Sequence, residues 1–267
     1  MTVLLLNAIA PPDADAGEGT AMTYRLLVWF SCGAASAVAA KIVSEMTLDM
    51  PVEYLYCNTL KFEHPDNIRF LHDVENWIGH EVKFLNPADF NGGYTDIYDV
   101  FERRHFLNGQ HGAQCTVLMK KTVREKYSTP DDIHVLGYVA EEVNRAARFN
   151  DANIGIETRW MLIEKNISKR RCLFMIQEAG IELPTMYKLG YKNNNCIGCV
   201  KGGMGYWNNI RRDFPEAFSH MASLERKLNA SCINGTFLDE LQLGKGRYEG
   251  EQNLECGLFC SYESQPS

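Results

Sequence analysis

Long apolar runs are absent from this 267-residue chain, and so is a strong excess of positive charge. No run of apolar residues approaches the roughly 20 that a membrane-spanning helix needs. The N-terminal stretch MTVLLLNAIA has no basic residue and only a short apolar core, unlike a secretory signal peptide. The net charge of −7 provides no overall basic surface for nucleic acid. We therefore expect a cytoplasmic protein with no membrane partner, and a nucleic-acid partner would need a local basic patch.

A disulfide framework is not expected either. The chain has nine cysteines, an odd number, and it is long for a disulfide-stabilised domain. Without a secretion signal, reduced thiols that react or bind a metal are the better interpretation.

The chain divides into three expected parts. Residues 11–20 (PPDADAGEGT) are typical of a flexible linker, so residues 1–22 are predicted to be a flexible N-terminal segment. Residues 23–185 are predicted to form an α/β domain, and residues 186–267 a cysteine-containing region packed on it. The overall content of 45% hydrophobic and 23% charged residues is ordinary for a soluble globular protein.

Strand-like and helix-like segments alternate through the first two thirds of the chain. Strands are predicted over residues 24–30, 52–57, 81–85, 133–137 and 160–164. Helices are predicted over residues 35–46, 65–78, 95–104, 115–126, 140–149, 168–180 and 215–229. This alternation predicts an α/β, Rossmann-like fold with a mostly parallel sheet and helices on both faces. Ligands of such sheets bind at the carboxyl ends of the strands, here after Phe30, Cys57 and Gly137.

The first of these loops, SCGAAS, joins a strand to a helix through small residues. Its candidate binding residues are Ser31, Cys32, Gly33, Ala34 and Ser36. Backbone N–H groups and the positive end of the helix dipole favour a phosphate or sulfate at such a turn. Close packing of a helix on a sheet also requires small residues, so the loop alone leaves both interpretations open.

The other two loops carry polar side chains. Asn58 and Thr59 follow the second strand and could hydrogen-bond a base or ribose, or simply form a turn. In GYVAEEVNRAARF, which begins at Gly137, Arg145 and Arg148 lie on one helix face and could clamp an anion. Pairing of these arginines with the nearby glutamates is the alternative.

Cysteines form the last group of candidates. Cys196 and Cys199 form a C-x-x-C inside a Gly/Asn-rich turn, a geometry that suits a metal, a cluster or a redox dithiol. Cys115 lies at a predicted helix N-terminus. Near the chain end, Cys256 and Cys260 form a C-x-x-x-C, and a thiol there is a candidate nucleophile. Cys172 and Cys232 are expected to be structural.

Together these segments resemble the phosphoadenosine phosphosulfate (PAPS) and adenosine phosphosulfate reductase family, within the adenine nucleotide α-hydrolase-like superfamily. The resemblance runs from Tyr24 to Cys199 and reappears in ECGL, residues 255–258. The family's serine-rich loop matches residues 31–36, and its Asp-Thr-Gly turn matches residues 58–60. Its Gly-x-Arg-x-Glu segment matches Gly137 to Glu141, with Val139 in place of the arginine. The resemblance implies an adenine-nucleotide site at these positions.

The resemblance also implies a reaction and a cofactor. Cys256 matches the catalytic cysteine, and a thioredoxin-like reductant would be the partner. Cys115, Cys196 and Cys199 match ligands of a [4Fe–4S] cluster, with zinc as the alternative metal. Because Gln114 stands where the family has a tandem cysteine, one ligand is either missing or supplied from elsewhere in the chain. Cys260 is the candidate that we include in the set, with Cys57 and Cys32 as alternatives. A homodimer stays open.

ATP pyrophosphatases of the same superfamily carry Ser-Gly-Gly-x-Asp-Ser, whose acid helps to hold Mg²⁺. Ala35 occupies that position here, so a hard cation would lack an oxygen ligand. This favours the reductase over an ATP-dependent adenylating or sulfur-transfer enzyme, for which Mg²⁺ would be the cofactor. A nucleotide-binding protein without catalysis is the third hypothesis.

Overall fold

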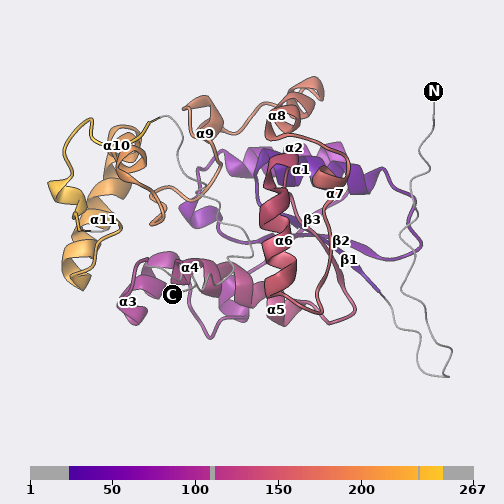
Figure 1. The fold of residues 1–267 in the computed structure, drawn as a ribbon, viewed down its shortest axis with the longest axis horizontal. Helices are drawn as coiled ribbons and strands as arrows, with labels where there is room; N and C mark the ends of the chain where they lie inside the picture. The colour runs from indigo at the N-terminus through magenta and orange to yellow at the C-terminus, as the bar shows by residue number, and fades with distance from the viewer. Residues whose placement is uncertain (1–23, 109–111, 234, 249–267) are drawn as a thin grey trace.

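A computed structural model of the protein describes residues 24–108, 112–233 and 235–248 (Figure 1). The predicted N-terminal segment 1–22 lies outside these ranges, and so do Cys256 and Cys260. None of the helices in the described ranges is long and apolar enough to cross a membrane.

A five-stranded sheet, parallel throughout, forms the centre of the fold, with the strand order β3-β2-β1-β4-β5. Its strands are β1 (Leu26–Phe30), β2 (Val52–Cys57), β3 (Val82–Leu85), β4 (Ile133–Val135) and β5 (Glu157–Arg159). All five residues of β1 are buried because β1 has a strand on either side and helices on both faces. The chain runs outward from β1 in one direction to β3 and in the other to β5. The crevice between β1 and β4 is therefore the topological switch point at which such sheets bind ligands.

Helices and short helical turns connect the strands. The α-helices are α1 (Ala34–Ser44), α2 (Asn67–Ile78), α3 (Ile97–Arg104), α4 (Gln114–Thr116), α5 (Thr122–Tyr127), α6 (Val143–Ala152), α7 (Met161–Glu164), α8 (Lys169–Glu178), α9 (Thr185–Lys188), α10 (Met204–Asp213) and α11 (Pro215–Leu228). The 3₁₀ turns are η1 (Leu60–Phe62), η2 (Pro87–Asp89), η4 (Ala140–Glu142) and η5 (Leu238–Glu240). A π-helical turn, η3 (Val117–Lys121), joins α4 to α5.

The two faces of the sheet bury alternate residues of β1. Leu26, Val28 and Phe30 pack into the core beneath α1, α2, α7 and α8. Leu27 and Trp29 point to the opposite face, where α5 and α6 supply apolar side chains. This period of two is the expected pattern for a strand buried on both faces. The prediction of an α/β fold with helices on both faces is confirmed (Figure 1).

A further apolar core lies beside the sheet. It joins α3 to α10 and α11, with Trp207 at its centre, and it includes the buried Cys199 and Cys232. Figure 1 shows α10 and α11 at one end of the molecule, away from the sheet.

Most predicted elements are present, and one is wrong. The strand over residues 52–57 has the predicted bounds, and Ser168 caps α8 as expected by accepting a bond from the N–H of Arg171 at 3.1 Å. The strand predicted over residues 160–164 is instead the helix α7, preceded by β5. The carboxylate of Glu164 accepts bonds from the N–H of Trp160 and the guanidinium of Arg159, which closes this turn. α9 and α10 were not predicted.

Candidate functional site

A cavity of about 120 Å³ lies at the switch point, beside the carboxyl ends of β1 and β4. Four parts of the chain line it: Trp29 and the loop after β1, Lys120 of η3, residues 136–139 with Glu142 and Arg145 after β4, and a group from the later chain. That last group consists of Lys169, Tyr187 and residues 193–195. Of the predicted nucleotide-binding residues, those in the lining are Ser31, Gly33, Ser36, Gly137 and Arg145.

The loop after β1 turns sharply into α1. Cys32 has a φ of +53°, which a non-glycine residue rarely adopts. Ser36 then fastens the turn, since its Oγ accepts from the N–H of Ser31 at 3.1 Å and donates to the carbonyl of Gly33 at 3.0 Å. The loop therefore directs the N-terminus of α1, with the positive end of its dipole, toward the cavity.

Two of the predicted loop residues face away from the cavity. Cys32 is fully buried, and its Sγ lies 3.9 Å from the carbonyl oxygen of Asn67 in α2. Ala34 is also fully buried, in the core under α1. The side chains of Cys32 and Ala34 therefore pack inside the fold, and only the backbone groups of these two residues could take part in binding.

Positive charge surrounds the cavity. Lys120, Arg145 and Lys169 line it, and among the described lining residues Glu142 is the one carboxylate. Glu142 is engaged, because it accepts from Arg145 at 2.5 Å and from the N–H of Val139 at 3.0 Å. Burial lowers the pKa of the Lys169 ammonium, which donates to the side-chain oxygen of Asn193. An anion in the cavity would stabilise the buried positive charge of Lys169 and so offset the cost of its desolvation.

Four other predicted nucleotide-binding residues do not line the cavity. Asn58 donates to Asn86 at 3.0 Å, and the buried hydroxyl of Thr59 donates to Glu63 at 2.6 Å. Glu141 accepts from the backbone of Lys169, and Arg148 lies exposed on α6. The side chains of Asn58 and Thr59 thus make internal hydrogen bonds in the turn after β2.

Lys169, Tyr187 and Asn194 are members of the lining that the sequence did not reveal. Each comes from the chain after β5, and Asn194 and Tyr187 bond to residues 162 and 153 positions away. The sequence predicted that a helix begins after Ser168, next to Lys169. It gave no indication that this end of the helix packs near α1.

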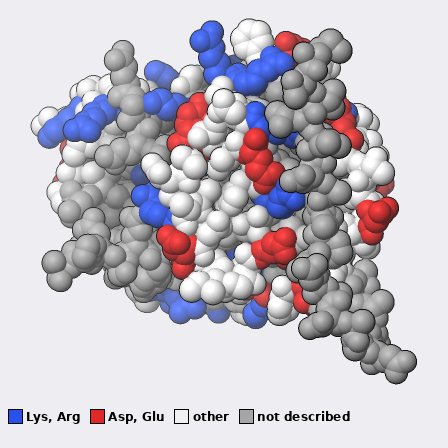
Figure 2. Space-filling view, turned by 45° about the vertical axis from the view of Figure 1, so that its right-hand side comes forward, with Lys and Arg blue, Asp and Glu red and all other residues white. Residues whose placement is uncertain are grey.

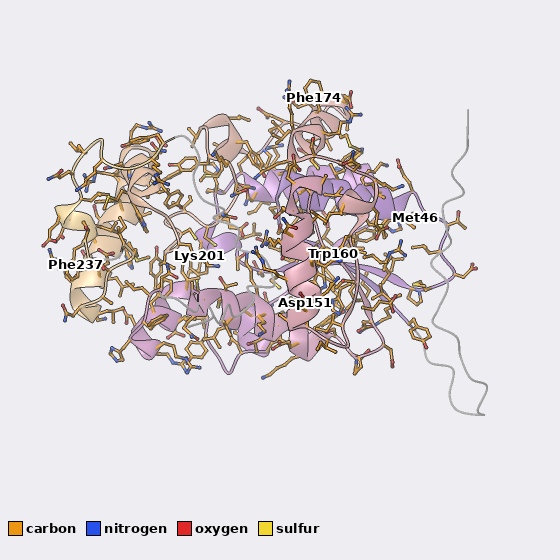
Figure 3. The ribbon with its side chains drawn as sticks, viewed as in Figure 1. Met46, Asp151, Trp160, Phe174, Lys201 and Phe237 are labelled. Carbon is orange, nitrogen blue, oxygen red and sulfur yellow. The ribbon has the colours of Figure 1, made fainter. Side chains whose placement is uncertain are left out.

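Three predicted metal ligands lie around a second, smaller cavity. Cys115, Cys196 and Cys199 line this space of about 20 Å³, together with Lys201. Figure 3 shows Lys201 in the middle of the molecule, far from Phe237 at the α11 end. The hydroxyl of Tyr206 fixes the C-x-x-C turn, since it accepts from the N–H of Cys199 at 2.9 Å and donates to the carbonyl of Cys196 at 3.3 Å.

The described residues around this second cavity do not by themselves form a ligand set. Within the described ranges, no group of three or more His, Cys, Asp or Glu side chains is placed to hold a metal ion. Cys232 lies near the same place, where burial raises its pKa and Glu225, Cys199 and Cys115 raise it further. Because Cys260 lies outside the described ranges, the iron–sulfur cluster or zinc site stays a prediction.

The remaining described cysteine expected to be structural is Cys172. It is fully buried in the core under α8, and burial raises the pKa of its thiol to about 12. A thiol with so high a pKa is a poor nucleophile at neutral pH.

The surface charge is mixed on the face that Figure 2 shows. Lys and Arg side chains there are interspersed with Asp and Glu rather than gathered into one basic area.

The chain was compared with models of known protein families and with curated protein sequences. Neither comparison gives a match, so the cavity's own geometry and chemistry carry the argument about function.

Proposed function

We propose that this protein binds an adenine nucleotide, with a phosphate or sulfate group held at the N-terminus of α1. The observation that supports this most is the convergence of Lys120, Arg145 and Lys169 on one cavity at the switch point of a parallel sheet. Cationic side chains and helix N–H groups together favour an anionic group. The adenine part of the ligand rests on the resemblance to sulfonucleotide reductases.

Reduction of a sulfonucleotide is the reaction that fits this pocket best. Ala35 lines the cavity at the position where ATP pyrophosphatases carry a magnesium-binding acid. The carboxylate of Glu142 already accepts bonds from Arg145 and from Val139. The described lining therefore offers a magnesium–pyrophosphate pair little oxygen ligation, whereas a sulfate or phosphate needs only the donors.

The proposed reaction has two steps. The thiolate of Cys256 attacks the sulfur of PAPS or adenosine phosphosulfate, so that an S–S bond forms, the S–O bond breaks and the nucleotide leaves with the electron pair. A thioredoxin-like dithiol then attacks the Cys256 sulfur, releases sulfite and closes to a disulfide, which regenerates the thiol. Cys256 lies outside the described ranges, and its role comes from the resemblance.

Binding is tested by calorimetry with PAPS, adenosine phosphosulfate and ATP. Replacing Lys169 by Met should weaken the affinity of the preferred nucleotide about tenfold or more, because a charge-assisted bond is lost. Lys126 is exposed on α5 outside the lining, and Lys126→Met is the matched control. Equal affinities of wild type and Lys169→Met would contradict the proposed site.

Turnover is tested by measuring sulfite with a thioredoxin-type reductant present. Cys256→Ser should abolish sulfite release and leave nucleotide affinity unchanged. Release of pyrophosphate from ATP would instead support the adenylating enzyme. Tight nucleotide binding with neither product would support the non-catalytic protein.

A further inference from the structure

Tyr187 reaches from α9 across to the first turn of α1. Its phenol oxygen accepts a hydrogen bond from the backbone N–H of Ala34 at 3.2 Å. The backbone N–H of Asn194 also acts on this oxygen, since it lowers the pKa of Tyr187 against the larger, raising effect of burial. A Cβ built on Gly33 would lie 3.7 Å from the same oxygen. The hydroxyl of Tyr187 therefore lies directly beside the N-terminus of α1, in the lining of the cavity.

The proton of this hydroxyl is left over. A phenol has one O–H donor and two acceptor lone pairs. The N–H of Ala34 uses the oxygen as an acceptor, so this bond leaves the proton unused. Among the described residues no acceptor of the Tyr187 proton is observed, and Tyr187 lines the cavity. N–H donors on the oxygen polarise the O–H bond and make it a stronger donor.

A buried chain of amides holds this arrangement in place. The carboxylate of Glu63 accepts from the Nδ2 of Asn67 at 2.7 Å, which leaves the Oδ1 of Asn67 to accept from Asn194 at 2.7 Å. The Nδ2 of Asn194 also donates to the carbonyl of Cys32 at 2.7 Å. A carboxylate only accepts, so Glu63 determines which side-chain atom of Asn67, and then of Asn194, donates and which accepts. These bonds hold Asn194 beside Tyr187.

A second anchor fixes α9 itself. The carboxylate of Asp66 accepts from the N–H of Thr185 at 2.9 Å and from its hydroxyl at 3.0 Å. Thr185 is the first residue of α9, two positions before Tyr187. The tyrosine hydroxyl is thus held from three parts of the chain, and its position does not depend on a ligand.

We propose that Tyr187 is an anion-binding residue, which donates its hydroxyl proton to an oxygen of the phosphate or sulfate bound at the α1 N-terminus. The inference rests on the proposed function, because it names a donor within the same site. Burial raises the pKa of Tyr187, so the hydroxyl keeps its proton at neutral pH. Tyr187 and Lys169, both from the part of the chain after β5, would then both donate to the anion.

The test compares ATP with adenosine, which lacks the anionic group, in calorimetric titrations of wild type and Tyr187→Phe. The ratio of the two affinities is measured on one sample, so a loss of folded protein cancels. We expect the preference for ATP over adenosine to fall about tenfold in Tyr187→Phe, since a bond to a charged group is lost. Tyr127→Phe is the matched control, because the Tyr127 hydroxyl donates to Glu53 on β2, outside the cavity lining.

An unchanged preference for ATP would overturn the inference. A stronger preference would do so as well, because the freed N–H group of Ala34 would then bind the anion directly. Lys169→Met separates the two proposals. If it weakens ATP binding while Tyr187→Phe does not, the site stands and only the role of Tyr187 fails. If wild type binds no nucleotide, the proposed function fails and the inference with it.

Discussion

Gly137 lies directly against the backbone of Ser36. A Cβ built on Gly137 would stand 2.6 Å from the backbone nitrogen of Ser36 and 2.7 Å from its Cα. The chain leaving β4 therefore touches the first turn of α1 with no room for a side chain. This contact brings Tyr138 and Arg145 to the same cavity as the loop after β1.

Replacing Gly137 by Ala should deform the cavity. The added methyl group meets backbone atoms, which cannot rotate away, so we expect the free energy of unfolding to fall by about 1–3 kcal/mol. Nucleotide affinity should fall with it, because α1 must shift. Chemical denaturation and calorimetric titration measure the two effects.

Gly203→Ala is the control for this substitution. Gly203 precedes α10, and a Cβ there would meet no atom within 4 Å. The control should change the free energy of unfolding by less than about 0.5 kcal/mol. Similar losses in both variants would show that the contact with Ser36 is not the cause.

Asn194→Asp tests the buried amide chain. The substitution replaces the Nδ2 donor by an oxygen that faces two acceptors, the carbonyl of Cys32 and the Oδ1 of Asn67. We expect a loss of about 1–3 kcal/mol in the free energy of unfolding, because buried acceptors lose their donor. Thermal and urea denaturation measure it.

The neighbouring residue gives a matched control. Asn193 only accepts a bond from Lys169, a role that a carboxylate also fulfils. Asn193→Asp should therefore leave stability nearly unchanged, yet weaken nucleotide binding, because it neutralises Lys169. An equal loss of stability in both variants would count against a special role of Asn194.

The order of strands and helices could be predicted because it depends on local patterns. The apolar run over residues 26–30, followed by small residues, marks the turn from β1 into α1. The error over residues 160–164 has a local cause as well, since five mostly apolar residues have no period that separates a short helix from a strand. The capping role of Glu164 shows only once the chain has folded.

The site could be predicted only in part. Ser31, Gly33 and Gly137 were found because a parallel sheet binds ligands at its strand ends. Tyr187 and Asn194 were missed because their contacts to Ala34 and Cys32 span 153 and 162 positions. No spacing rule in the sequence encodes such contacts, which follow from the packing of α9 on α1.

Asp66 should make stability depend on pH. Its carboxylate accepts from Arg69 at 2.6 and 2.9 Å. The hydrogen bond from Arg69 is the main reason why the pKa of Asp66 lies well below its usual range. Thr185 lowers this pKa as well, whereas burial opposes the shift. A carboxyl whose pKa is lower in the folded than in the unfolded state stabilises the fold above the unfolded value of about 3.9. This contribution is lost as the pH falls toward the folded value.

The comparison of wild type with Asp66→Ala measures this contribution. The difference in unfolding free energy should be about 1–3 kcal/mol above about pH 5 and should shrink below about pH 4. Asp131→Ala, an exposed site beside β4, is the control and should cost less than about 0.5 kcal/mol at each pH. A difference that is constant with pH for Asp66→Ala would show that ionisation plays no part.

The cavity shared by Cys115, Cys196 and Cys199 leads to a prediction about metal content. We predict that anaerobically purified protein contains iron or zinc, and that Cys196→Ser and Cys199→Ser lose most of it, because thiolates are the ligands of both. Among the described residues the thiols do not by themselves form a ligand set, so the metal content tests the prediction directly. Elemental analysis measures the content, and a brown colour distinguishes a cluster from colourless zinc.

Cys172→Ala is the control for the metal prediction. Cys172 is buried in the core on the α1 side of the sheet, so its loss should leave the metal content unchanged. If wild type purified without oxygen holds neither iron nor zinc, the predicted centre is wrong. In that case the two hydrogen bonds of the Tyr206 hydroxyl would stabilise a C-x-x-C turn that holds no metal. The thiols of Cys196 and Cys199 should then both react with a thiol reagent once the chain is unfolded.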